Sequence, residues 1–322
     1  MYRPSKKNQA KRQSRAAARR EPSSPGGQTD GMTVQWYPGH MAKTRRMIQE
    51  NLKLVDLVVE ILDARIPDSS RNPDLDELVG EKPRLILLNR ADQADPGMNR
   101  VWADWFRAQG FSVLQTDCKT GAGVKQFPAV VRGILADKIA RWEERGQVGR
   151  PIRVMVAGVP NVGKSTFINQ VAQRKAAAAE NRPGLTRGKQ WVTVDAGLEL
   201  LDTPGILWPK FEDQTVGLHL AFTGAVKDTI MDLETLGCQL IRLLASRYPE
   251  AVQARYKIDT PEDAQGWELL EAAARKRGFL VSGGEVDLER MARVLLEEYR
   301  SGRLGRFTLE EPPAVEKGTH SN

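Results

Sequence analysis

The sequence has few cysteines and histidines and no long hydrophobic run. Its 322 residues include two cysteines, Cys118 and Cys238, and three histidines, which offer neither a disulfide framework nor a metal-ligand cluster. No apolar run approaches the ~20 residues that span a bilayer, and the N-terminus lacks the hydrophobic core of a secretion signal. We therefore expect a soluble cytoplasmic protein with no membrane partner.

The formal net charge of +7 is concentrated at the N-terminus. Residues 1–31 carry eight basic side chains against Glu21 and Asp30, which accounts for six of the seven net charges. With no apolar periodicity, this stretch is expected to be a disordered basic arm. It would attract RNA phosphates in a salt-sensitive way, or it is a solvated tail ahead of a start at Met32. An organelle transit peptide is a third interpretation of the same composition.

A glycine-rich loop follows a predicted strand at residues 152–157. Residues 158–165, here called the phosphate loop, match G-x-x-x-x-G-K-[ST] in full and lead into a predicted helix. In such loops, backbone N–H groups and the helix N-terminus hold phosphate oxygens. Lys164 would reach the β- and γ-phosphates, and the Ser165 hydroxyl would bind Mg²⁺. The residues expected to contact the nucleotide here are Asn161, Val162, Gly163, Lys164, Ser165 and Thr166.

A second predicted strand, residues 198–201, ends in Asp202-Thr203-Pro204-Gly205. Asp202 fits the carboxylate that supports Mg²⁺ in nucleotide hydrolases, and the Gly205 amide fits a γ-phosphate sensor. Between this strand and the phosphate loop, residues 182–188 form a Gly/Pro loop containing Thr186. We expect Thr186 to close over the metal ion when the γ-phosphate is present.

Two earlier strands carry the residues expected to recognise the base. The strand predicted at residues 83–88 leads to Asn89-Arg90-Ala91-Asp92, which is close to the N-K-x-D box of guanine-binding proteins. The Asp92 carboxylate would accept from the two N–H donors on the guanine edge, and the flat guanidinium of Arg90 can cover a ring face. A strand at residues 111–115 leads to residues 116–119, where Cys118 and Lys119 would lie near the base.

The order of these boxes is rotated, because the guanine boxes precede the phosphate loop. In this order the chain resembles the circularly permuted GTPases, most closely the ribosome biogenesis GTPase A family, over roughly residues 32–310. The resemblance also rests on residues 36–41, 63–67, 202–209 and 304–310. It implies an α/β fold in which a permuted P-loop GTPase domain with a mostly parallel sheet precedes a small all-α domain. The scarcity of metal ligands argues against the permuted relatives that carry a zinc module.

The patterning predicts four regions: a basic arm at 1–31, the GTPase domain at 32–212, a helical domain at 213–302 and a C-terminal tail at 303–322. Leucines at three- and four-residue spacing predict a helix at 233–248. Thr260-Pro261-Glu262-Asp263 predicts the start of a helix that runs to Gly278, and Asp287 should cap a helix that stops near Gly302. In the family, the helical domain docks on ribosomal RNA; simple packing is the plainer interpretation.

One absence bears on the mechanism. Ile206 and Leu207 follow Gly205, where other GTPases carry a water-positioning glutamine. The resemblance nominates His40 to orient the water; the alternative roles for this residue are a helix cap or an RNA contact. Asn161 resembles the asparagine that binds K⁺ in potassium-stimulated GTPases, so a K⁺ ion is the second candidate for stabilising the transition state.

The sequence therefore predicts a slow, Mg²⁺-dependent GTPase, in which His40, Lys164 and Thr186 support hydrolysis. The resemblance implies that it assists assembly of the large (50S) ribosomal subunit by binding rRNA and precursor particles, with no DNA partner. Alternatives are a GTP-binding switch or scaffold with negligible hydrolysis, an organellar ribosome assembly GTPase, and a phosphoryl-transfer enzyme acting on a small molecule. The guanine boxes count against the last of these.

Overall fold

The computed structural model describes residues 39–176, 191–195, 197–203, 205, 213–226, 232–281 and 283–313, with the backbone alone at 39–44 and 173–176. The predicted basic arm, residues 1–31, lies outside these ranges. The bounds of the four predicted regions stay predictions.

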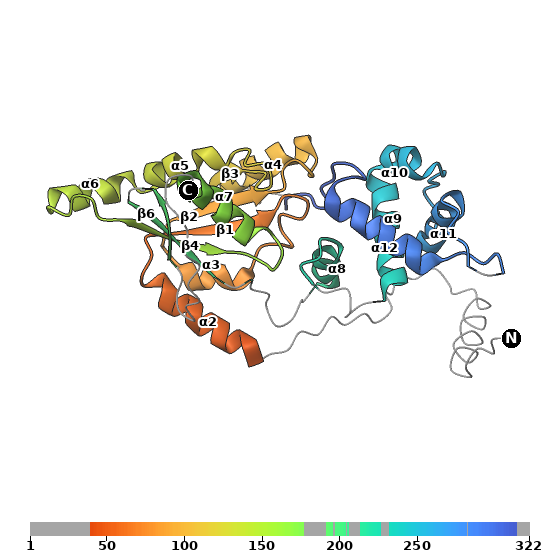
Figure 1. The fold of residues 1–322 in the computed structure, drawn as a ribbon, viewed down its shortest axis with the longest axis horizontal. Helices are drawn as coiled ribbons and strands as arrows, with labels where there is room; N and C mark the ends of the chain where they lie inside the picture. The colour runs from red at the N-terminus through yellow and green to blue at the C-terminus, as the bar shows by residue number, and fades with distance from the viewer. Residues whose placement is uncertain are drawn as a thin grey trace, which may run out of the picture. The chain divides into compact units, whose positions relative to one another are not determined.

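A six-stranded sheet forms the first part of the described chain (Figure 1). Its spatial order is β3-β2-β1-β4-β6-β5, and every neighbouring pair is parallel except β5 with β6. The strands are β1 (Leu57–Asp63), β2 (Arg84–Asn89), β3 (Ser112–Gln115), β4 (Ile152–Ala157), β5 (Trp191–Asp195) and β6 (Leu198–Asp202). The predicted mostly parallel sheet is confirmed, and the four strands predicted from apolar runs agree to within one or two residues.

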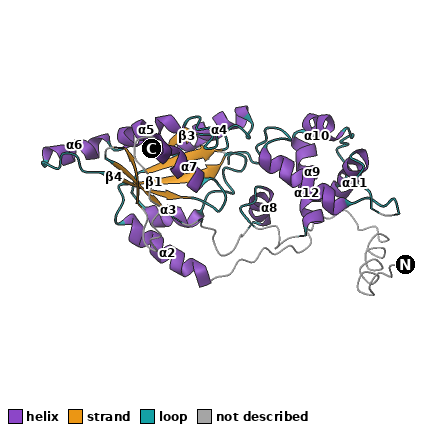
Figure 2. Ribbon diagram, in the orientation of Figure 1, coloured by secondary structure: helices purple, strands orange, loops and turns teal. Residues whose placement is uncertain are grey.

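Helices cover both faces of the sheet (Figure 2). Strand residues that alternate along β1 pack against different helices, because successive side chains point to opposite faces. One face packs on Phe127 and Phe167, and the other packs on Ile48, Leu75 and Trp102. The helices of this part are α2 (Gly39–Leu52), α3 (Pro73–Val79), α4 (Pro96–Ala108), α5 (Phe127–Ile134), α6 (Ala136–Glu144) and α7 (Lys164–Ala176), with a 3₁₀ turn at Val124–Gln126.

Burial on both faces explains the composition of the central strand. All seven residues of β1 are buried, and five of them are apolar, as parallel strands covered on both sides require. Of its two acidic residues, Asp63 ends the strand, and Glu60 lies within it with Oε2 3.3 Å from Nη1 of Arg84 on β2. Burial raises the pKa of Glu60 against the opposing effect of Arg84. This carboxyl–guanidinium pair joins β1 to β2 inside the core.

The strand order reverses between β1 and β4. The chain runs from β1 outward through β2 to β3, and then returns to the other side of β1 with β4. In open parallel sheets, such a reversal leaves a crevice at the carboxyl ends of the two strands, where ligands bind. Asp63 ends β1, and the phosphate loop follows β4. Because the strands that precede the boxes are parallel, the box residues lie at one edge of the sheet in spite of their rotated order.

The second part of the described chain consists of helices. They are α8 (Gln214–Phe222), α9 (Leu233–Arg247), α10 (Pro249–Tyr256), α11 (Gly266–Lys276) and α12 (Leu288–Ser301). Asp287 caps α12 by accepting from the Arg290 amide, and Gly302 ends it with a positive φ of 75°. Both observations confirm the predicted limits of that helix, as α9 confirms the leucine pattern.

The predicted start of α11 is wrong. The helix begins at Gly266 rather than after Thr260. The backbone amide of Gln265 donates to Glu268 Oε2 at 2.9 Å, and the helix begins five residues later than Pro261 suggested. Thr260 instead accepts a hydrogen bond from Gln253 Nε2 at 2.8 Å. A tertiary contact therefore uses the side chain that the sequence pattern assigned to capping.

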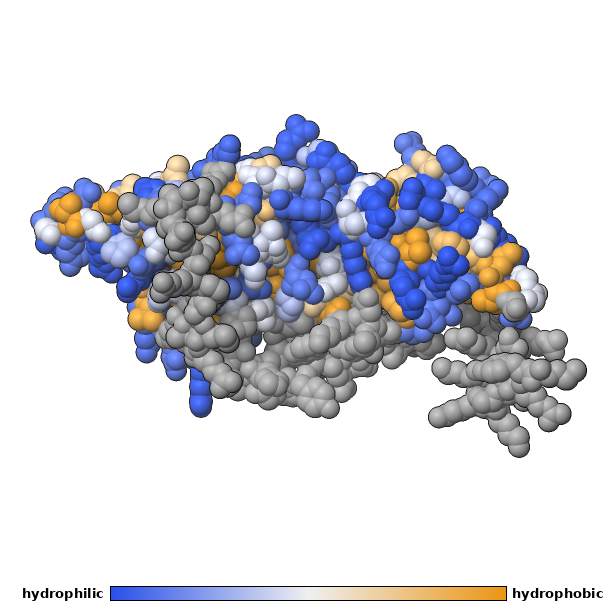
Figure 3. Space-filling view, in the orientation of Figure 1, coloured by the Kyte–Doolittle hydropathy of each residue, from blue (hydrophilic) through white to orange (hydrophobic). Residues whose placement is uncertain are grey.

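Hydrophilic side chains cover most of the described surface visible in Figure 3. Among the described residues, the large hydrophobic side chains that remain exposed are Leu54, Val101, Val148, Trp267, Leu280 and Val281. Among the residues described, no helix is both long and apolar enough to cross a bilayer. The same residues contain no group of three or more histidine, cysteine or acidic side chains arranged to hold a metal ion.

Helix α9 approaches α12 so closely that its glycine has no room for a side chain. A Cβ atom at Gly237 would lie 2.6 Å from Ala292 Cβ, whereas a Cβ at Gly133 of α5 would meet nothing within 4 Å. We expect Gly237→Ala to lower the free energy of unfolding by about 1–3 kcal/mol through overpacking. Gly133→Ala should instead raise it by up to about 1 kcal/mol, because alanine favours helix. Urea unfolding of both variants tests this, and equal effects would contradict it.

Candidate functional site

The phosphate loop has the backbone of an anion cradle. Gly163 has a φ of 107° and Asn161 a φ of 58°, so both residues adopt conformations that L side chains rarely take. A Cβ at Gly158 would lie 2.5 Å from the Ile61 carbonyl oxygen, so glycine is required there for packing against β1. Helix α7 begins at Lys164, which places its free N-terminal amides at the end of this loop.

Lys164 folds back onto its own loop. Its Nζ donates to the carbonyl oxygens of Gly158 at 3.1 Å and Val159 at 3.0 Å. The residue is 8% exposed, and this burial lowers the pKa of the amine to about 8, while Asp202 acts in the opposite direction. The ammonium group is thus held beneath the loop in a site where added negative charge would stabilise its protonated form.

The end of β6 lies against the phosphate loop. A Cβ at Gly205 would be 2.7 Å from Pro160 Cα and 3.1 Å from Lys164 Nζ. Thr203 Oγ1 donates to the Val156 carbonyl at 2.6 Å, which ties the turn after β6 to β4. Partial burial raises the pKa of Asp202, although Lys164 opposes this. The structure therefore brings together Lys164, Asp202 and Gly205, as their proposed roles require.

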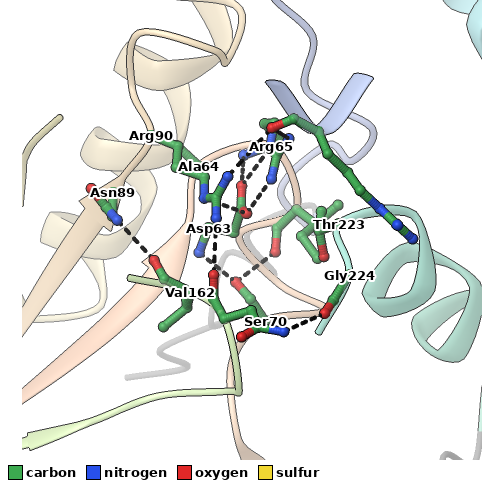
Figure 4. Close-up of polar contacts among 12 residues, drawn as sticks. Asp63, Ala64, Arg65, Ser70, Asn89, Arg90, Val162, Thr223 and Gly224 are labelled. Atoms are coloured by element: carbon green, nitrogen blue, oxygen red, sulfur yellow. Dashed lines mark hydrogen bonds and ion pairs between the residues drawn. The ribbon is translucent and has the colours of Figure 1, made fainter. Parts of the chain in front are cut away.

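Asn89 connects the base-recognition segments with the phosphate loop. Its Nδ2 donates to the Val162 carbonyl at 2.8 Å, a contact visible in Figure 4. Its Oδ1 accepts from the Cys118 amide at 3.0 Å and from Thr116 Oγ1 at 3.4 Å. A Cβ at Gly163 would lie 2.4 Å from Asn89 Nδ2, so the loop approaches as closely as glycine allows. One buried amide side chain thus joins all three segments.

Arg90 begins the guanine loop, defined here as residues 90–95, and has a positive φ of 61°. Its Nη2 donates to the Asn161 carbonyl at 2.9 Å. Its Nε lies 3.5 Å from Oδ2 of Asp63, a carboxylate that also pairs with Arg65 at 2.7 Å (Figure 4). Burial raises the pKa of Asp63, but the guanidinium groups outweigh it, so that pKa lies below its usual range. Asp63 therefore stays charged and restrains both arginines.

Asp92 and Lys119 are exposed, whereas Cys118 is buried. Partial burial and the neighbouring Asp117 both raise the pKa of Asp92. Burial raises the pKa of the Cys118 thiol to about 11, which keeps it protonated at neutral pH. Asp117 Oδ1 accepts from the Lys119 amide at 2.8 Å and thereby shapes the loop after β3. Contact of these residues with a base stays a prediction.

Several predicted residues cannot be placed together by the described chain. His40 lies near the start of α2, where the backbone alone is described. Thr186 and Ile206 lie outside the described residues. Ser165 and Thr166 are exposed in the first turn of α7, beside the phosphate loop. The roles of His40 and Thr186 in hydrolysis therefore rest on the sequence.

Asn161 contacts the helical part of the chain, which the sequence did not predict. Its Nδ2 donates to the Gly224 carbonyl, just after α8, at 2.8 Å. Arg65 makes a related contact, since its Nη1 donates to the Tyr299 carbonyl of α12 at 3.2 Å. Asn161 and Arg65 both lie in segments that the sequence analysis singled out. Their partners lie more than sixty positions away in the sequence, so only the fold reveals the contacts.

The donor set suits a magnesium ion. The Ser165 hydroxyl and the Asp202 carboxylate are hard oxygen ligands, which Mg²⁺ prefers over nitrogen or sulfur. Magnesium usually keeps several waters and takes one or two protein ligands together with phosphate oxygens, so the absence of a denser acidic cluster in the described chain is compatible with it.

Comparison with known proteins places these features in a family. Residues 153–250 match the protein-family model described as "50S ribosome-binding GTPase". Ribosome biogenesis GTPase A of Priestia megaterium is 48% identical over 288 residues, covering 89% of this chain and 99% of the relative. The chain belongs to the ribosome biogenesis GTPase A family. The relative of the same name from Bacillus cereus is 44% identical over 87% of this chain and 95% of its own length.

A solved structure agrees with this ribosome biogenesis GTPase A assignment. GNP-bound YlqF from T. maritima is 30% identical, covers 84% of this chain and 99% of its own, and gives a TM-score of 0.59. The resemblance inferred from the rotated order of the boxes is thereby confirmed, and with it the permuted GTPase fold.

The low pKa of Lys164 leads to a prediction about pH. A bound phosphate favours the ammonium form, so the complex binds more protons than the free protein above pH 8, and affinity must fall as the pH rises. From a free pKa of about 8, we expect GDP affinity to be about fourfold lower at pH 8.5 than at pH 7. Calorimetry in two buffers of different ionisation enthalpy should detect proton uptake, and unchanged affinity without uptake would contradict the assignment.

Proposed function

We propose that this GTPase binds GTP in the crevice between β1 and β4, hydrolyses it slowly, and assists assembly of the large (50S) ribosomal subunit. The chain is a GTP-hydrolysing enzyme of ribosome assembly, as its family membership indicates. The observation that carries the site is the Asn89 side chain, which bonds the phosphate loop and the loop after β3 at once.

The chain's own residues supply most of the chemistry. Amides of the phosphate loop and the first turn of α7 would hold the phosphates, and Lys164 would move from its loop carbonyls to phosphate oxygens. The Gly205 amide, next to Pro160 and Lys164, would donate to the γ-phosphate. Ser165, Asp202 and Thr186 would hold Mg²⁺, which neutralises charge that develops on the phosphates.

Two groups are candidates for activating hydrolysis. His40, on α2, would orient the attacking water as a neutral imidazole. A K⁺ ion held by Asn161 would place positive charge near the β–γ bridge, as an arginine finger does. Asn161 donates through Nδ2 to Gly224, and its Oδ1 is the atom that would bind the cation. Either arrangement gives weak turnover in isolation.

The proposed partners are rRNA and precursors of the large subunit, reached through the helical part of the chain. No DNA or membrane partner is proposed. The proposed location is the cytoplasm, because the two bacterial relatives are named as ribosome biogenesis GTPases. The Asn161–Gly224 contact supports a link between the helical part and the nucleotide, because it joins the phosphate loop to the segment after α8. Docking of the helices on RNA would thus affect the phosphate loop that binds the nucleotide.

Base selection is tested through Asp92. Asp92→Asn should weaken GTP binding at least about tenfold and shift preference toward XTP, because xanthine reverses one of the two polar partners. Asp104→Asn on the surface of α4 is the matched control and should change neither affinity. Kd values for GTP, XTP and ATP measure the effect. Equal ATP and GTP affinity in the unmutated protein would overturn the assignment.

Hydrolysis is tested with large-subunit precursor particles in K⁺ and Na⁺ buffers. His40→Ala should keep GTP affinity but lose most particle-stimulated kcat, because it acts only on the transition state. Asn161→Ala should remove the difference in turnover between K⁺ and Na⁺ buffers. Asn161→Asp separates the two roles of this residue, because it retains an oxygen ligand and loses the bond to Gly224. An unmutated protein that particles do not stimulate would favour the scaffold alternative.

A further inference from the structure

A segment that follows α12 runs along the guanine loop. Residues 302–310, here called the C-terminal strap, contact residues 91–95 through side chains and backbone. The strap lies more than 200 positions after the loop in sequence. Its residues belong to the segment predicted as a tail, apart from Gly302.

Arg306 holds the loop on both sides of its recognition residue. Its Nε donates to the Ala94 carbonyl at 3.2 Å, and its Nη2 donates to the Ala91 carbonyl at 3.3 Å. Asp92 lies between these two carbonyls in the chain. The planar guanidinium fixes its donors relative to one another, so this pair of contacts restrains the span of the loop.

The strap adds one backbone contact and one side-chain contact to the loop. The Phe307 amide donates to the Gln93 carbonyl at 2.9 Å. Thr308 Oγ1 accepts from the Asp95 amide at 3.2 Å and lies 3.3 Å from the Ala64 carbonyl. Thr308 is 1% exposed and Phe307 is 2% exposed, so both are fixed by their surroundings. Together with Arg306, the strap satisfies backbone groups at four of the six loop residues.

The strap is continuous with α12. Gly302 ends that helix, and a Cβ there would lie 2.9 Å from Gln93 Cγ, so the helix end presses directly on the loop. The Leu304 amide donates to the Glu298 carbonyl at 3.2 Å, which ties the first part of the strap to the last turn of α12. The guanine loop is therefore supported by the helical part of the chain.

Bonds from outside the strap also hold the loop, since Asn99 Nδ2 donates to the Ala91 carbonyl at 2.9 Å and the Ala94 amide donates to the Arg90 carbonyl at 3.2 Å. The Ala91 amide donates to the Thr116 carbonyl at 3.1 Å, and the Gln93 amide donates to the Arg90 carbonyl at 2.9 Å. An exposed carboxylate that must meet two N–H donors at hydrogen-bond distance needs a fixed backbone, because such bonds weaken steeply with misalignment. The strap supplies contacts on both sides of that carboxylate.

We propose that Arg306 and Thr308 are positioning residues for guanine recognition, which hold the guanine loop so that Asp92 meets both N–H donors of the base. The inference rests on the proposed binding of guanine nucleotides at this site. It assigns the strap to base specificity and not to the phosphates.

Inosine diphosphate provides the discriminating probe, because its base lacks the 2-amino group and offers Asp92 a single N–H donor. The ratio of GDP to IDP affinity therefore reports how well Asp92 is held. Arg306→Ala should lower this ratio about tenfold, the value of one hydrogen bond to a charged group. Arg303→Ala is the matched control, because Arg303 is exposed and donates to Ser301 Oγ two positions away. It should leave the ratio unchanged.

Thr308 is tested with a second pair of variants. Thr308→Val keeps the shape but removes the acceptor for the Asp95 amide, and should lower the GDP-to-IDP ratio. Thr308→Ser keeps the hydroxyl and should restore most of it. Circular dichroism before titration verifies that each variant is folded.

The outcomes separate the inference from the proposed function. If Arg306→Ala and Thr308→Val weaken GDP and IDP equally, or leave both unchanged, the strap does not position Asp92 and the inference is overturned. An unmutated protein that binds GDP and IDP equally would overturn it too. Binding of ADP as tightly as GDP by the unmutated protein would overturn the proposed function itself.

Discussion

The nucleotide site depends on the hydrogen bonds of one buried side chain. Asn89 is 3% exposed, and its amide donates to the phosphate loop while its oxygen accepts from the loop after β3. A buried amide left without partners would cost roughly 1–3 kcal/mol per group, so each of these segments is held in place by the others. The permutation leaves this contact intact. Asn89 ends β2, two strands away from β4 in the sheet, and this spacing does not depend on which strand comes first in the sequence.

Helices α8 and α12 of the second part of the chain also contribute to the site. The Arg65 guanidinium is 1% exposed, pairs with Asp63, and donates to the last turn of α12. On the other side, His219 of α8 lies with Nδ1 2.7 Å from Glu310 Oε1 and 3.1 Å from Ser69 Oγ. Arg65 and Ser69 both belong to the segment directly after β1, so contacts from α8 and α12 meet the same segment. Polar groups that a separate domain would expose to water are here satisfied between the two parts of the chain.

The sequence pattern predicted those elements whose limits are set by residues close together in the chain. Apolar runs located β2, β3, β4 and β6, and the caps of α12 were found because Asp287 and Gly302 act within a few residues. The start of α11 was missed because Thr260 is bonded to Gln253 of another helix. Asn89, Lys164 and Gly205 were recognised by motif, since their spacing reflects the ligand. Residues 304–310 were marked only by the family resemblance. The contacts that Arg306 and Asn161 make were not predicted, because neither contact has a local signature and only the folded chain brings the partners together.

The long reach of the strap has a consequence for synthesis. The Arg306–Ala94 bond joins residues 212 positions apart, so the guanine loop is made long before the residues that support it. At roughly 5–20 residues per second, the delay on the ribosome is on the order of 10–40 s. During that interval the sheet can form while the base site stays open on one side. A nascent chain would thus acquire its phosphate-binding loop before it acquires a finished means of telling one purine from another.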